Sequence, residues 1–152
     1  MTTGTANSKT NDRAQLRTLM DDRIRAVRDK NVNKAMSSIA QDILSFDVVK
    51  PFRQVGLDAA KKRAEDWFST FEGPISYEIK DLIITTGANV AFAHGLSHVS
   101  ATKKDGIQLD MWWRTTICFR KIYEQWMVTH EHNSVPFDVE SGKASLDFKP
   151  IG

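Results

Sequence analysis

Cysteine, tyrosine, proline and long apolar runs are all scarce in this sequence, and the scarcity excludes several classes of protein. The single cysteine, Cys118, cannot form an internal disulfide, which argues against a small secreted scaffold. No run is long and apolar enough to span a membrane, and no apolar segment follows the polar start MTTGTANSKTNDR to act as a secretion signal. We therefore expect a cytoplasmic protein without a membrane partner.

An excess of charge of one sign is also missing. The chain has 21 Lys and Arg residues against 19 Asp and Glu residues, a formal net charge of +2, and these charges are interspersed. Nucleic-acid-binding proteins usually gather basic side chains on one face, so no nucleic-acid partner is expected. What the sequence does contain is 152 residues with 41% hydrophobic side chains, enough for one domain with a sizeable core.

The apolar pattern predicts helices in the first half of the chain. Residues 1–10 are small and polar and predict a disordered lead, so residues 11–150 form the single domain. Over residues 11–31, apolar side chains recur at steps of three and four, which is typical of an amphipathic helix. A short helix is predicted over 31–42, a short strand over 43–49 and a third helix over 55–72, before Gly73 and Pro74.

The second half of the chain has the composition of strands. Residues 75–86, 89–102, 107–121 and 125–135 are rich in branched and aromatic side chains, and turn residues separate them. Consecutive strands joined by short turns form an antiparallel meander. The expected fold class is therefore α+β, with helices covering one face of a curved antiparallel sheet.

The turns set which side chains share a face of the sheet. A two-residue turn at Asp105-Gly106 would place the next strand so that His98 lies opposite Trp113. A two-residue turn at Tyr123-Glu124 would set the strand register of the last hairpin in the same way. The pairs then expected are Leu96 with Thr115, His94 with Ile117, Ile117 with His130, Thr115 with His132, and Phe119 with Val128. All four histidines would lie on one face, and Glu131 on the other, near Arg114 or Thr116.

Three segments resemble a known family: GLDAAKKRAEDWFSTFEGPISYEIKDL, DMWWRTTICFRK and QWMVTHEHNSVPFD. Together with the order of helices and strands, they are similar to the SnoaL-like, ketosteroid-isomerase-like branch of the nuclear transport factor two superfamily over residues 11–150. The most specific part is Arg114 and Thr116 before a hairpin, then Trp126 and a His-x-His strand ending at Ser134.

The resemblance implies a cone-shaped barrel, in which a curved sheet wraps around the N-terminal helices and encloses a deep, mostly apolar pocket for a small apolar molecule. It also implies a homodimer through the outer sheet face. Enzymes of this family perform acid/base chemistry without a metal or another cofactor: a pocket side chain removes a proton beside a carbonyl, and a polar group stabilises the oxyanion.

Asp47 and His130 are the candidate catalytic residues. Asp47 is a carboxylate inside a short apolar strand, where it is costly unless it faces a pocket or a partner. The alternative is that it ends the strand in solvent or caps the turn before Pro51. His130 is predicted to lie deep on the inner face and could act as base or donor at neutral pH. The alternative is a core histidine whose second nitrogen bonds a neighbouring side chain.

Eight further residues are predicted to line the pocket: Trp67, Phe71, His94, His98, Trp113, Thr115, Ile117 and His132. The aromatic residues among them are expected mainly to pack in the core and secondarily to contact a ligand. The four histidines are too widely spaced across the sheet to converge on a metal, and no carboxylate or cysteine is fixed beside them. No metal site is expected, and Cys118 is a packing residue.

Two functions remain open. The first is an acid/base enzyme of the isomerase, cyclase or dehydratase type that acts on a small apolar carbonyl compound. The alternative is a homodimer of the same fold that binds a small molecule without catalysis, since this fold hosts both.

Overall fold

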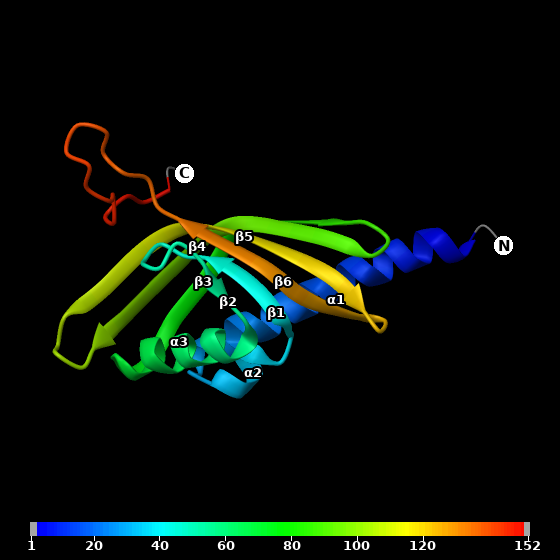
Figure 1. Ribbon diagram of the computed structural model, residues 1–152, viewed down its shortest axis with the longest axis horizontal. Helices are drawn as coiled ribbons and strands as arrows, with labels where there is room; N and C mark the ends of the chain where they lie inside the picture. The colour runs from blue at the N-terminus through cyan, green and yellow to red at the C-terminus, as the bar shows by residue number, and fades with distance from the viewer. Residues whose placement is uncertain (1–2, 151–152) are drawn as a thin grey trace.

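The computed structural model describes residues 3–150, in which three helices and six strands are present. The helices are α1 (Thr3–Arg28), α2 (Val32–Met36) and α3 (Leu57–Ser69). The strands are β1 (Ile39–Phe46), β2 (Gln54–Val55), β3 (Phe71–Thr86), β4 (Val90–Lys103), β5 (Gln108–Ile122) and β6 (Gln125–Ser134). The helices lie against one face of the curved sheet, the inner face, and leave the outer face uncovered (Figure 1).

The first helix is longer than the amphipathic segment that predicts it. Leu16 and Met20 are buried at 0% and 1% exposure, so the apolar face is confirmed. Residues 3–10, expected to be a disordered lead, form the first turns of α1, and residues 1–2 lie outside the described residues. Adding residues to an existing helix gains one hydrogen bond per residue without a new nucleation cost, which explains the extension.

Two boundaries in the first half differ from the prediction. The segment expected to be a second helix over 31–42 is helical only to Met36, and β1 begins at Ile39. Ile39 and Ile43 are 3% and 2% exposed, so burial in the sheet prevails over local helix preference. The third helix ends at Ser69, and β3 begins at Phe71 and continues through Gly73 and Pro74.

The sheet is mixed rather than wholly antiparallel. Its strand order is β2-β1-β6-β5-β4-β3, and β1 runs parallel to β6, with Phe46 paired to His132. Strands β3 to β6 form the expected meander, and the α+β class is confirmed. Because β1 and β6 are parallel neighbours, the residues that follow them leave the sheet at the same end.

The hairpin between β4 and β5 has one more turn residue than predicted. Lys103 donates its N–H to the carbonyl of Ile107, at 2.8 Å, so the turn contains Lys104, Asp105 and Gly106. Gly106 has φ +85°, a left-handed conformation that a three-residue hairpin turn requires and that glycine adopts at little cost. His98 is therefore opposite Trp112 instead of Trp113. A shift of one residue in this register reverses which side chains of β4 share a face with those of β5.

The last hairpin has the predicted turn but contains a bulge. Tyr123 and Glu124 have φ 48° and 64°, and Phe119 pairs with Val128 as predicted. Cys118 then pairs with His130, which leaves Thr129 as an extra residue. Beyond the bulge the pairs are Ile117 with Glu131, Thr116 with His132 and Thr115 with Asn133. The predicted pairs of Ile117 with His130 and Thr115 with His132 are wrong.

The core fills the space between the helices and the inner face of the sheet. One buried cluster joins Leu16 and Met20 of α1 to Ile117, Phe119 and Val128 of β5 and β6. A second cluster surrounds the end of α3 and the start of β3: Phe68, Phe71, Ile75, Val99 and Ala101. No helix among residues 3–150 is long and apolar enough to cross a membrane.

Candidate functional site

A cavity of about 900 Å³ lies between the helices and the inner face of the sheet. The three helices, the six strands and residues after β6 contribute to its lining. Its walls are mostly apolar and include Val27, Ile39, Trp67, Phe71, Val99 and Trp113. Ligand pockets of small molecules have this size and this predominance of apolar groups.

Five of the ten predicted site residues line this cavity: Asp47, Trp67, Phe71, Trp113 and Ile117. Thr115 faces the same side of the sheet but is packed in the core at 3% exposure and is not part of the lining. Trp67 and Phe71 meet edge to face, with ring centroids 5.2 Å apart. The aromatic wall was thus predictable from the helical and strand periodicities that place these residues inward.

The four histidines share one face, but it is the outer face. His94 pairs with Thr116 and His98 with Trp112, because of the three-residue turn. His130 and His132 lie on that face because of the bulge at Thr129. None of the four lines the cavity, so their predicted places in the pocket are wrong.

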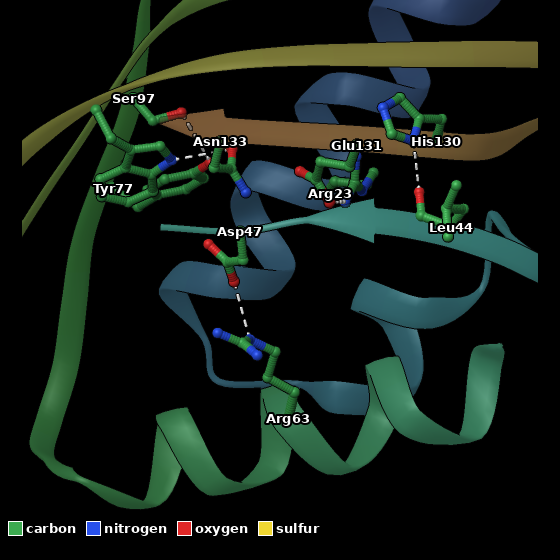
Figure 2. A network of polar contacts seen from close by, with 10 residues as sticks. Arg23, Leu44, Asp47, Arg63, Tyr77, Ser97, His130, Glu131 and Asn133 are labelled. Atoms are coloured by element: carbon green, nitrogen blue, oxygen red, sulfur yellow. Dashed lines mark hydrogen bonds and ion pairs between the residues drawn. The ribbon is translucent and has the colours of Figure 1, made fainter. Parts of the chain in front are cut away.

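His130 and Asp47 therefore do not form the predicted pair. His130 Nδ1 donates to the backbone carbonyl of Leu44, at 2.7 Å, and its ring packs edge to face against Phe46. Figure 2 shows His130 on the opposite side of β6 from Arg63, to which Asp47 points. The alternative, a core histidine bonded to a neighbouring side chain, is wrong as well, because His130 lies on the outer face and bonds a backbone carbonyl.

Asp47 is in the cavity and is bound to an arginine. It follows the last residue of β1, and its Oδ2 lies 2.8 Å from Nε of Arg63 on α3 in an ion pair. Its Oδ1 accepts a hydrogen bond from the N–H of Val48 at 2.7 Å. Both side chains of the ion pair are 28% exposed, so the pair lies at the wall of the cavity and not in bulk solvent.

Glu131 forms a second carboxylate–arginine pair in the cavity. Its Oε2 lies 3.4 Å from a terminal nitrogen of Arg23 on α1, and the two side chains are 24% and 16% exposed. The prediction placed Glu131 on the outer face beside Arg114 or Thr116, and the bulge at Thr129 reverses this. Arg114 instead donates to Ser134.

A third group of polar contacts surrounds Tyr77 of β3. Its hydroxyl lies 3.4 Å from the hydroxyl of Ser97, which is 0% exposed, and its ring stacks on Trp113. Trp113 Nε1 donates to Asn133, at 3.2 Å. Burial raises the pKa of the Tyr77 phenol above its ordinary value, and the charge of Glu131 raises it further, whereas the hydrogen bond with Ser97 lowers it. Tyr77 is therefore a protonated donor at neutral pH.

Sequence reasoning missed Arg23, Arg63, Tyr77, Glu131 and Asn133 as cavity residues. The signals available for them were weak, because each is a polar residue that an amphipathic pattern assigns to solvent. Their partners come from other elements, so only the packed structure brings them together (Figure 2). Within residues 3–150, no three His, Cys, Asp or Glu side chains are grouped so that they could hold a metal ion.

Comparisons with known proteins agree with this architecture. Residues 16–138 match the family model described as the SnoaL-like domain, and the chain belongs to this family. It is 30% identical to an NTF2-like protein of unknown function from Pseudomonas putida KT2440, with 93% of this chain and 98% of that chain covered and a TM-score of 0.84. The predicted family is thereby confirmed, as is the nuclear-transport-factor-2-like (NTF2-like) fold.

More distant solved structures share the fold. A ketosteroid isomerase-like protein from Erwinia carotovora atroseptica is 20% identical, with 80% of this chain and 93% of that chain covered and a TM-score of 0.68. A candidate scytalone dehydratase from Novosphingobium aromaticivorans is 13% identical, with 95% and 99% covered and a TM-score of 0.76. A search of the curated proteins finds no match.

Proposed function

We propose that this protein is an acid/base enzyme, of the isomerase, cyclase or dehydratase type, that acts on a small and largely apolar carbonyl compound. The observation that carries the proposal is the mostly apolar cavity whose few polar groups include the carboxylates of Asp47 and Glu131 and the half-buried phenol of Tyr77. Solved structures of the same fold bear isomerase-like and dehydratase names, which supports the choice of reaction class.

Each polar group has a role in the proposed reaction. Asp47 or Glu131 accepts a proton from the carbon beside the carbonyl, and the electron pair of the broken C–H bond moves to the carbonyl oxygen as an enolate. Tyr77 donates a hydrogen bond to that oxygen, because its raised pKa keeps the phenol protonated. Return of the proton to another carbon completes an isomerisation, and loss of a β-hydroxyl as water completes a dehydration.

The proposal is tested by hydrogen exchange beside a carbonyl. The wild-type protein in D₂O should exchange the methyl protons of 2-acetylnaphthalene or of its 6-carboxylate, 6-acetyl-2-naphthoic acid, and NMR measures the rate. Asp47→Asn, Glu131→Gln and Tyr77→Phe are compared, and the variant of the working base should lose about a hundredfold or more of the rate. His130→Gln, on the outer face, is the control and should keep it. Absence of exchange by the wild type with both ketones would contradict the proposal.

A second candidate function is binding without catalysis, by a homodimer of this fold. The observation in its favour is that the two candidate bases, Asp47 and Glu131, are already paired with arginines, so neither is a free base in this state. Under this alternative, apolar aromatic ketones quench the fluorescence of Trp67 and Trp113 on binding, but no variant changes a rate because no exchange occurs.

A further inference from the structure

The cavity holds two arginines whose hydrogen-bonding capacity is largely unused. A guanidinium has five N–H donors arranged as a planar fork. Arg63 forms an ion pair with Asp47 through Nε, and among residues 3–150 its terminal nitrogens have no hydrogen-bond partner. Arg23 contacts Glu131 through one terminal nitrogen, at 3.4 Å. Figure 2 shows Arg63 beside Asp47, which follows β1, and Arg23 beside Glu131 of β6.

We propose that Arg63 binds an anionic group of the ligand, a carboxylate, and that this group takes Arg63 over from Asp47. The carbonyl compound is then an acid with an apolar body. The inference rests on the proposed function and specifies its substrate class. It also accounts for a base that is bound to an arginine before the substrate arrives.

The position of Arg63 favours it over Arg23 for this role. The Arg63 side chain is 28% exposed and that of Arg23 is 16% exposed, so a carboxylate at Arg63 stays closer to water. The cost of removing an anion from water is therefore smaller at Arg63. The apolar body of the ligand would extend from there along the aromatic wall of Trp67, Phe71 and Trp113, which lines the same cavity.

The exchange of partners leaves Asp47 in place. The N–H of Val48 still holds its Oδ1, at 2.7 Å, while Oδ2 loses its ion pair with Arg63. A terminal-nitrogen fork bonds a carboxylate through two parallel hydrogen bonds, whereas Arg63 contacts Asp47 through Nε. The incoming anion can thus compete with Asp47 through better geometry. Asp47 then has a free oxygen lone pair with which to accept a proton.

The test uses two probes that differ in charge, 2-naphthoic acid and 2-naphthamide, titrated at pH 7 with tryptophan fluorescence as the readout. The wild type should bind the acid at least about tenfold more tightly than the amide, as hydrogen bonds between charged groups predict. Arg63→Gln should remove this preference and leave the affinity for the amide unchanged. Lys61→Gln, exposed on the same helix, is the matched control and should leave both affinities unchanged.

Further variants check that the preference for the acid depends on the Arg63 fork. Arg23→Gln should keep the preference, and Asp47→Asn should strengthen acid binding because no ion pair has to be broken. Thermal melting checks that each variant is folded; if Arg63→Gln is not, Arg63→Lys keeps the charge, removes the fork and should weaken acid binding alone. Equal affinity of the wild type for acid and amide, or loss of the preference in Arg23→Gln instead, would overturn the proposal.

Exchange of the methyl protons in D₂O separates this inference from the proposed function. If Arg63 recruits an acid and frees Asp47, the wild type exchanges 6-acetyl-2-naphthoic acid faster than 2-acetylnaphthalene. Equal exchange of both ketones would sink the inference and leave the proposed function standing. If no ketone exchanges but the protein still prefers naphthoic acid through Arg63, the proposed function fails. The part of the inference that assigns an acidic ligand to Arg63 then stands.

Discussion

At the level of single residues, Asp12 links α1 to the hairpin between β5 and β6. It is 6% exposed and accepts hydrogen bonds from Lys121 at 2.8 Å and from Trp126 Nε1 at 3.1 Å. Lys121 also lies over the Trp126 ring, 5.0 Å from its centroid. These contacts fasten α1 to the hairpin between β5 and β6.

Asp12→Asn should lower the free energy of unfolding by about 1–3 kcal/mol at pH 7, because Lys121 loses its charged partner. The hydrogen bond from Lys121 is the largest cause that lowers the pKa of the Asp12 carboxyl; burial opposes it and the bond from Trp126 adds to it. A lowered folded pKa stabilises the protein above the unfolded pKa, about 3.9, and this advantage is lost as the pH falls through the folded pKa.

Chemical denaturation between pH 7 and pH 2.5 checks this prediction. The difference between wild type and Asp12→Asn should be constant down to about pH 4 and should shrink below it. Asp22→Asn is the control, since Asp22 and Arg25 form a pair whose side chains are 65% and 71% exposed. A constant difference at all pH values would show that Asp12 acts through packing alone.

At the level of secondary-structure elements, Gly95 of β4 lies beside a bulge in its neighbour β3. A Cβ at this position would lie 2.6 Å from Cγ2 of Ile79 and 3.1 Å from the carbonyl oxygen of Lys80. The register between β3 and β4 shifts just there, between Lys80 and Ile83, and Asp81 has φ 56°. The absence of a side chain thus lets a bulged strand approach closely.

Gly95→Ala should destabilise the protein by about 1–3 kcal/mol, because the added methyl group forces the backbone of β3 away. Thermal melting measures the effect, and Ser100→Ala, on the same strand, is the control. A melting temperature equal to that of the wild type would mean that β3 can shift without cost. In that case the close approach does not determine the curvature of the sheet.

For the molecule as a whole, the uncovered outer face of the sheet carries apolar side chains. Ile83, Val90 and Phe92 are 53%, 57% and 44% exposed. Phe92 stacks on His94, and His98 stacks on Trp112 with ring centroids 4.1 Å apart. Aromatic and polar groups of this mixture are enriched in subunit contacts, and a two-fold dimer would bring the same patch of both copies together.

We therefore predict a homodimer through this outer face. Sedimentation at micromolar concentration should give twice the chain mass of 17.2 kDa. Phe92→Arg should shift the protein to the monomer, because like charges would meet across the two-fold axis. Val139→Arg, at a position that is 84% exposed after β6, is the control and should leave the mass unchanged. A wild-type monomer of 17.2 kDa would remove the prediction.

Local patterns in the sequence were enough to predict the family, the α+β class and the apolar lining of the cavity. Periodicity is a local property, so Leu16 and Met20 on α1 and Trp113 and Ile117 on β5 were placed inward correctly. The turn at Tyr123-Glu124 was also predictable, because its two residues lie between two clear strands. Asp47 was found because a carboxylate in an apolar strand is costly without a partner.

Which polar side chains enter the cavity depends on tertiary packing. One extra residue in the turn at Gly106 and one at the Thr129 bulge each reverse a face, and neither leaves a trace in the hydrophobic pattern. Arg23 and Glu131 are 108 residues apart in sequence, so no local rule pairs them. The site could not be predicted because strand register depends on single backbone conformations, whereas the fold depends on averages over whole segments.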